Sequence, residues 1–546
     1  MDGFRDQLVA DVAIEIRVAQ ELDDLVRALG GNGLALCDPC MAGSRLDILQ
    51  EIETRIKSTD GHNVIWIRGS PGVGKSALAA SITTRLLNQN RHVIWFRFNR
   101  TQSTTITTET LWRVVACGLA CRYPSLRQRL AQGNTELSSS NIDHLFEMLI
   151  QEPLSTLDGV SHEELPVIVI DALDECGGLR HDDLGQKDYN ALLRTLRQWV
   201  EVDHLKKFKL VITSRPEGRL TQTFPDSTTI YINIPSGSGV KPEDSASHDI
   251  RTFLKFRLGT MEVEPEWIAK ALDYLVPQAV GIFIWATTVA EFLQDSPHVR
   301  FDILEKRKWG DDTEGLDDLD SLYLTVITTS FRRALKPEIK AITSVIGAMI
   351  FAKQPLNDAA LTRLPGVEST HMLNYIQSGL MSVIDSGPIL HFHHRSFEDF
   401  LLSSFFRQAL TKLSDVQNRK PHERQLAAMC LNCMVPSDLH FNMCNLQSLN
   451  IKNVHIPATV KSAISPLISY LSQFWADHLV QTQHEEILMK AVEFVMYEKL
   501  LFWIEVMSIL GKAHEVFAIL KQALEWPTLA VCPEYVSYNT SLRLAG

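Results

Sequence analysis

The stretch that decides the fold is Gly69-Ser70-Pro71-Gly72-Val73-Gly74-Lys75-Ser76. It fits the phosphate-loop pattern G-x-x-x-x-G-K-[ST] at every fixed position. The apolar run Val64–Arg68 precedes it, and the helix-forming run Ala77–Leu86 follows it. A strand, a glycine-rich turn and a helix in this order are the context in which the pattern binds phosphate. A glycine-rich turn that holds no ligand is the less favoured alternative.

Each residue type in this loop has a chemical role. The glycines let the backbone curl so that several N–H groups point at the phosphates. The N-terminus of the following helix, which includes Ala77, adds the positive end of its dipole. Lys75 supplies an ammonium group for the β- and γ-phosphates, and the Ser76 hydroxyl is placed to bind Mg²⁺. We therefore expect ATP or ADP with Mg²⁺, and these residues do not distinguish adenine nucleotides from GTP.

An acidic motif follows the apolar run Val167–Ile170. It reads Asp171-Ala-Leu-Asp174-Glu175 and begins at the carboxyl end of a predicted strand, the edge where open α/β sheets bind ligands. We expect Asp171 to hold Mg²⁺ directly or through water. Glu175 is the candidate that orients or deprotonates the attacking water, and Asp174 is its neighbouring alternative. A solvated acidic loop after a core strand would look similar when considered alone.

An arginine follows another apolar run, Leu210-Val-Ile-Thr-Ser-Arg215-Pro216. At this edge of the sheet an arginine can sense the γ-phosphate through charge-assisted contacts, so we group Arg215 with the catalytic candidates. The alternative is a surface arginine at the end of a strand.

The sequence around these motifs alternates short apolar runs with helical stretches. Near-continuous apolar runs suit strands that are buried on both faces of a parallel sheet. Their alternation with helices predicts an α/β domain covered by helices on both sides. The polar stretch 176–188 is predicted as a loop. The five predicted strands are Val64–Ile67, Val93–Phe98, Val167–Ile170, Leu210–Thr213 and Thr229–Ile234.

Helical patterns dominate the rest of the chain, and they also occur at residues 8–30 and 45–57. Three helices and a hairpin are predicted within residues 338–405, which is a winged-helix pattern. The chain is too long for one core. We expect a short N-terminal helical segment at 1–44, a P-loop NTPase core at 45–235, a helical domain at 236–335, a winged-helix domain at 336–405 and a C-terminal helical region at 406–546.

Composition limits the classes of protein. The net charge of −12 gives no basic footprint for nucleic acid, and nine cysteines in 546 residues do not make a disulfide framework. The most apolar long stretch, Val276–Leu293, is interrupted by polar residues and is short for a membrane span. We expect a cytoplasmic protein with no membrane span and no nucleic-acid partner.

Together these motifs resemble the NACHT-type signal-transduction NTPases, the nucleotide-binding core of NOD-like receptors, and in particular their fungal, nephrocystin-type group. The P-loop, the acidic strand and Thr213-Ser-Arg-Pro216 look like the core of that family. The likeness covers roughly residues 40–510. Further similar segments are Cys40–Leu49, Gly281–Ala286, Leu319–Tyr323, His394–Leu401 and Phe474–Leu479.

The resemblance implies a five-stranded parallel sheet in which the strand before Arg215 lies between the P-loop strand and the Asp171 strand. It implies nucleotide-driven opening and self-oligomerisation, with an unidentified effector or signalling partner. His394 matches the winged-helix histidine that reaches the β-phosphate of ADP in this family. From the residues alone, His394 is more often a satisfied core histidine. Two departures are Ile282-Phe283, where many relatives have x-Pro, and the absence of a recognisable repeat up to Gly546.

Three hypotheses follow for the function. The first is a slowly hydrolysing nucleotide switch in intracellular signalling, innate immunity or fungal non-self recognition. The second is a metabolic or DNA-processing P-loop ATPase with rapid turnover, which needs a substrate site or a basic groove that the sequence does not display. The third is a scaffold with a degenerate site, against which the intact Lys75, Ser76 and Asp171 argue.

Overall fold

The computed structural model describes residues 36–100, 106–123, 141–157, 160–177, 183–216, 218–236, 244–306, 318–367, 369–385, 389–434, 439–446, 463–524 and 526. The chain divides into two compact units, Met1–Arg307 and Lys308–Gly546, which are described separately. The predicted helix at residues 8–30 lies outside the described residues.

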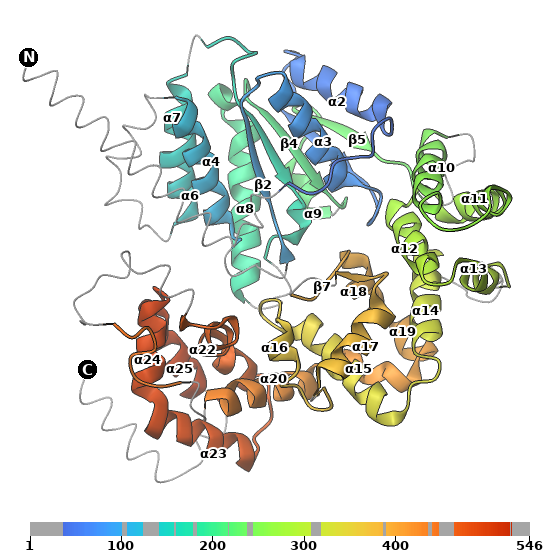
Figure 1. Ribbon diagram of the computed structural model, residues 1–546. Coiled ribbons are helices and arrows are strands. Elements are labelled where there is room, and N and C mark those ends of the chain that lie inside the picture. Colours follow the sequence, from blue (N-terminus) through green and yellow to red (C-terminus); the bar gives the residue numbers. More distant parts are fainter. Residues whose placement is uncertain are drawn as a thin grey trace, which may run out of the picture. The chain divides into compact units, whose positions relative to one another are not determined.

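Five parallel strands form the centre of the first unit (Figure 1). Their order, β2-β3-β4-β1-β5, places the strand before Arg215 between the P-loop strand and the Asp171 strand, as predicted. Each observed strand matches its predicted run to within one residue at either end. The strands are β1 (Val64–Arg68), β2 (Val93–Arg97), β3 (Val167–Asp171), β4 (Lys209–Ser214) and β5 (Thr229–Asn233).

Helices cover both faces of this sheet because successive strand residues point to opposite sides. In β1, Ile65 and Ile67 pack in a core with α2 and α3, whereas Val64 and Trp66 pack in a second core with α4, α6 and α8. A strand with both faces buried has to be apolar throughout, which explains the unbroken runs in the sequence. The helices are α2 (Leu46–Lys57), α3 (Lys75–Asn88), α4 (Thr108–Arg122), α6 (Ile142–Phe146), α7 (Glu152–Ser155), α8 (Asp183–Glu201) and α9 (Gly218–Thr223), with a π-helical turn at Glu147–Gln151.

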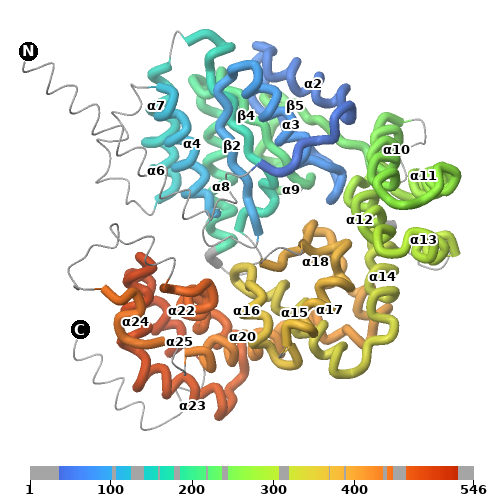
Figure 2. The backbone as a smooth tube through the Cα atoms, in the orientation of Figure 1, coloured from blue at the N-terminus to red at the C-terminus, as the bar shows by residue number. Residues whose placement is uncertain are grey.

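The prediction of a loop at 176–188 is partly wrong, because α8 begins at Asp183. Further helices lie beyond the sheet in the described part of the first unit, and their path can be followed in Figure 2. The chain turns sharply between α11 and α12, where Val280 and Gly281 both adopt positive φ angles, of 45° and 78°. These helices are α10 (Ser245–Leu258), α11 (Pro265–Ala279), α12 (Phe283–Gln294) and α13 (Pro297–Lys306).

The second unit is mostly helical, as predicted. Its helices α15 (Lys336–Phe351), α16 (Asp358–Leu361) and α17 (Thr370–Leu380) precede an antiparallel pair, β6 (Ile384–Asp385) and β7 (His391–Phe392). This is the predicted order of three helices and a hairpin, with shorter strands. The predicted turn at 386–388 lies outside the described residues. The other helices are α14 (Asp318–Ser330), α18 (Arg395–Leu401), α19 (Ser404–Ala409), α20 (Arg419–Met434), α22 (Pro466–Leu479), α23 (Glu486–Phe494), α24 (Leu500–Ile509) and α25 (Val516–Leu524).

Candidate nucleotide site

The P-loop connects the end of β1 to the start of α3. Gly72 and Gly74 have φ angles of 76° and 92°, in the region that favours glycine. Gly74 is the N-cap of α3, and no side chain caps this end of the helix. The first N–H groups of α3 therefore remain available for an anion, which is the property that a phosphate-binding helix start requires.

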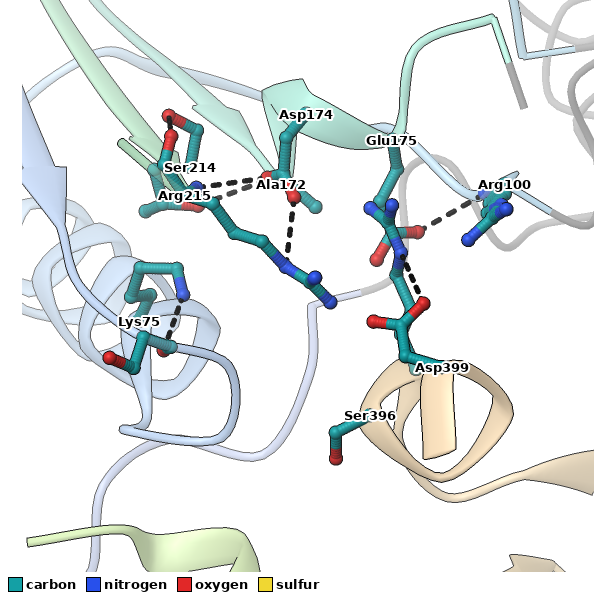
Figure 3. Close-up of polar contacts among 12 residues, drawn as sticks. Lys75, Arg100, Ala172, Asp174, Glu175, Ser214, Arg215, Ser396 and Asp399 are labelled. Carbon is teal, nitrogen blue, oxygen red and sulfur yellow. Dashed lines mark hydrogen bonds and ion pairs between the residues drawn. The ribbon is translucent and has the colours of Figure 1, made fainter. Parts of the chain in front are cut away.

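Lys75 begins α3, and its side chain turns back over the loop (Figure 3). Its Nζ donates to the carbonyl oxygens of Gly69 and Ser70, both at 3.0 Å. Burial lowers the pKa of Lys75 to about 8, although the acidic side chains of Asp174, Asp171 and Glu175 oppose this shift. The three acids predicted at the end of β3 thus lie within electrostatic range of the P-loop lysine.

Asp171 is the last residue of β3, and its side chain is completely buried. Its Oδ1 accepts a hydrogen bond from Thr213 Oγ1 at 2.5 Å, which fixes the plane of the carboxylate. Its Oδ2 accepts no hydrogen bond, although a buried charged oxygen is costly without a partner. A carboxylate oxygen that accepts no hydrogen bond suits Mg²⁺, which prefers oxygen ligands. Asp171 and the Ser76 hydroxyl are the residues that would hold this ion, whose bound charge would offset that of the phosphates.

The chain reverses direction immediately after Asp171. Ala172 adopts a left-handed φ of 55°, its N–H donates to Thr213 Oγ1 at 2.9 Å, and a 3₁₀ turn, Leu173–Glu175, follows. A non-glycine residue in this region stores about 1–2 kcal/mol of strain, and such strain occurs often at functional sites. The turn presents Asp174 and Glu175 at the carboxyl edge of the sheet.

Asp174 and Glu175 have different partners. Arg215, which follows β4, places its Nε 3.5 Å from Asp174 Oδ2 and donates its backbone N–H to Asp174 Oδ1 at 3.3 Å (Figure 3). Glu175 Oε2 accepts the backbone N–H of Arg100 at 3.1 Å. Asp174 is therefore placed to orient the phosphate-sensing candidate Arg215, which leaves Glu175 as the better candidate for activating water.

Several neighbours of the site were not singled out from the sequence. Arg97, the last residue of β2, places its Nε 3.4 Å from Asp171 Oδ2. Cys37 Sγ donates to the Ser76 carbonyl oxygen at 3.1 Å. Burial, reinforced by Asp171, raises the pKa of this thiol to about 12, so it remains protonated. Of these residues, Arg97 could have been identified from the sequence, because it is a charged residue at the end of an apolar run. Asp171 and Arg215 occupy the same position after their own runs.

Arg45 joins the P-loop to the helical part of the same unit. Its Nη2 donates to the Val73 carbonyl oxygen at 3.0 Å, and its Nε lies 3.7 Å from Asp249 Oδ2 on α10. Its guanidinium group also lies over the ring of Phe283, at 4.9 Å from the centroid. Both members of the ion pair are buried, so one enclosed arginine side chain contacts the loop, α10 and the start of α12.

A second link runs through the backbone. The N–H of Ile284 on α12 donates to the Gly72 carbonyl oxygen at 3.0 Å. A Cβ atom at Gly72 would meet Ile284 Cγ2 at 2.0 Å, so this position has no room for a side chain. The Gly281–Ala286 segment, which lacks the proline of many relatives, therefore reaches the P-loop through Ile284.

His394 belongs to the second unit, where it caps α18. Its Nδ1 accepts the N–H of Ser396 at 3.1 Å and lies 2.7 Å from Ser396 Oγ, which contacts the Tyr323 hydroxyl at 2.7 Å. The segments Leu319–Tyr323 and His394–Leu401, which both resemble segments of the NACHT-type family, are thus in contact within this unit. Because Nδ1 accepts a hydrogen bond, the neutral ring carries its proton on Nε2.

A protein family and a curated relative are similar in sequence to this chain. Residues 43–215 match the family described as Nephrocystin 3, N-terminal, a stretch that contains the P-loop, the acidic strand and Arg215. A curated relative is the vegetative incompatibility protein HET-E-1 of Podospora anserina, 23% identical over 507 residues. These similarities support the nephrocystin-type, NACHT-like resemblance of residues 43–215. The match covers 85% of the chain and 34% of HET-E-1, so the chain spans about a third of that relative's length.

Solved structures match this chain weakly. One chain of the Escherichia coli HORMA:CdnC:Trip13 complex has a TM-score of 0.28 and 10% identity, covering 56% of this chain and 88% of that one. Domain III of the Thermotoga maritima replication initiation protein DnaA has a TM-score of 0.25 and 12% identity, covering 52% and 92%. The P-loop NTPase fold rests instead on the sheet order and the loop geometry. Within the described residues, no helix is long and apolar enough to cross a bilayer.

Nucleotide affinity should fall about tenfold between pH 7 and pH 9, because Lys75 has a pKa of about 8 in the free protein. Phosphate stabilises the ammonium form and raises this pKa in the complex, so binding above pH 8 requires the uptake of a proton. Titration of ADP at several pH values measures the effect. Lys75→Arg is the control, because arginine stays charged over this pH range. Whatever affinity for ADP this variant keeps should not change between pH 7 and pH 9. A flat profile for the wild type would contradict the expectation.

Proposed function

We propose that this chain is a nucleotide-dependent conformational switch, in which ADP or ATP with Mg²⁺ sets the position of the helical elements against the sheet. One observation carries the proposal: the carbonyl groups of Gly72 and Val73 are hydrogen-bonded to Ile284 and Arg45. A P-loop that adjusts to its phosphates must strain or release these bonds. The state of the nucleotide is thereby communicated to α10 and α12.

A switch requires that nucleotides bind its two states with different affinities. Moving a population from 1:99 to 99:1 takes about 5.5 kcal/mol of differential binding. Contacts of Lys75 and Arg215 with the phosphates are proposed sources of this difference. The γ-phosphate, present only in ATP, would compete for the Arg215 guanidinium group with Asp174, whose Oδ2 lies 3.5 Å from Arg215 Nε.

We retain His394 as a proposed ligand of the ADP β-phosphate in the closed state. Its support is the family resemblance together with the proton on Nε2, which is the donor that a phosphate oxygen requires. Self-oligomerisation on activation and an unidentified effector partner are part of the same proposal.

The similarity to HET-E-1 supports a role in fungal non-self recognition or a related intracellular response. A cytoplasmic site of action fits this role. We propose no nucleic-acid partner, because the net charge of −12 opposes phosphate backbones.

Protein purified without added nucleotide should contain tightly bound ADP and should hydrolyse ATP slowly. Denaturation followed by mass spectrometry identifies the released nucleotide, and a turnover assay with and without DNA or RNA measures hydrolysis. Empty protein with rapid turnover would instead establish the metabolic or DNA-processing ATPase. Failure to bind either labelled ATP or labelled ADP would establish the scaffold.

A further inference from the structure

A cation from the protein itself faces the oxygen that Mg²⁺ would use. Arg97 and Asp171 are register partners on the adjacent strands β2 and β3 and form the last pair of that ladder. Parallel pairing therefore places both side chains at the carboxyl edge of the sheet. Among the described residues, Arg97 is the only basic side chain within ion-pair distance of Asp171.

The contact between these two groups is incomplete. Arg97 Nε and Asp171 Oδ2 lie 3.4 Å apart, and both atoms are buried without a hydrogen-bond partner. Well-formed pairs of arginine and carboxylate instead have donor–acceptor distances of about 2.7–2.9 Å. Arg97 therefore offsets the negative charge of the buried Asp171 carboxylate but donates no hydrogen bond to Oδ2. Another cation can replace Arg97 at this oxygen at modest cost in free energy.

The two side chains also differ in their freedom to move. The Asp171 side chain is 0% exposed and is fixed by Thr213, whereas the Arg97 side chain is 36% exposed. An arginine can turn into water with its charge hydrated, while a completely buried carboxylate cannot leave. Any exchange of partners at this oxygen must therefore proceed by departure of Arg97.

We propose that Arg97 is the resting counter-ion of Asp171 and that Mg²⁺ replaces it when the nucleotide binds. The inference rests on the proposed function and adds a regulatory step to it. A guanidinium group and Mg²⁺ at the same carboxylate oxygen repel each other, so entry of the metal favours departure of the guanidinium group.

The experiment compares full-length wild type with Arg97→Gln, using fluorescently labelled ADP and titrated MgCl₂. The variant should need about tenfold less Mg²⁺ for half-maximal stabilisation of the complex, because no internal cation competes. Its affinity for ADP in EDTA should equal that of the wild type. Arg68→Gln is the matched control, because Arg68 ends β1 but donates to Asn233 rather than to an acid.

Melting temperature supplies a second readout that requires no nucleotide. In EDTA, Arg97→Gln should unfold at a lower temperature than the wild type, since Asp171 loses its counter-charge, and Mg²⁺ alone should stabilise the variant more than the wild type. An unchanged Mg²⁺ dependence overturns the proposal. So does a loss of ADP affinity in EDTA, which would make Arg97 a phosphate ligand. If the wild type binds no ADP at all, the proposed function fails, and the melting comparison still decides the role of Arg97.

Discussion

Lys75→Ala should weaken the binding of ADP by about a hundredfold or more. A hydrogen bond to a charged group contributes about 1.5–3 kcal/mol, and Lys75 is the ammonium group that the P-loop offers to the phosphates. A loss of about 3 kcal/mol corresponds to roughly a hundredfold in the dissociation constant. Isothermal titration calorimetry on protein stripped of nucleotide measures the difference.

The variant should still fold, because within the described residues the ammonium group donates hydrogen bonds only to the loop carbonyls of Gly69 and Ser70. Lys57→Ala is the matched control, since it removes the same charge from an exposed position in α2. Control and wild type should bind ADP equally. If Lys75→Ala binds as tightly as they do, the loop does not hold phosphate in the way that its sequence indicates.

The backbone framework of the site could be predicted because local patterns determine it. Each core strand is a run of apolar residues, and the motif Gly69–Ser76 sits between such a run and a helix. The exact start of α8 could not be predicted. The stretch Asp183–Asp188 is rich in polar residues, as the water-facing side of an amphipathic helix is. Composition alone does not distinguish such a stretch from a polar loop.

The missed residues acquire their roles through contacts that are distant in sequence. Thr213 contacts Asp171 only because β4 lies beside β3, and Arg97 contacts it only through the register of β2. Arg45 is a clearer case, since its acidic partner Asp249 lies 204 residues further along the chain. Burial raises the pKa of Asp249, and Arg45 opposes that rise, an effect visible only in the folded unit. The family resemblance identified the segment around Arg45 but assigned no role to the Arg45 side chain.

Gly72→Ala should destabilise the first unit more than Gly74→Ala does. Both glycines have positive φ angles, so alanine costs about 1–2 kcal/mol at either position. At Gly74 the added Cβ meets nothing within 4 Å, whereas at Gly72 it meets Ile284 Cγ2 at 2.0 Å and Ile284 Cβ at 2.8 Å. Overpacking of this kind adds about 1–3 kcal/mol, so the difference between the variants reports the contact with α12.

Melting temperatures of the two variants give the difference in stability, and hydrogen exchange at the Ile284 amide shows where it arises. That amide is bonded to the Gly72 carbonyl oxygen, so Gly72→Ala should expose it to exchange while Gly74→Ala leaves it protected. Both variants alter the phosphate loop, so impaired nucleotide binding alone would not separate them. Equal melting temperatures with a protected Ile284 amide in both would mean that α12 accommodates the methyl group, and that the loop does not control the position of this helix.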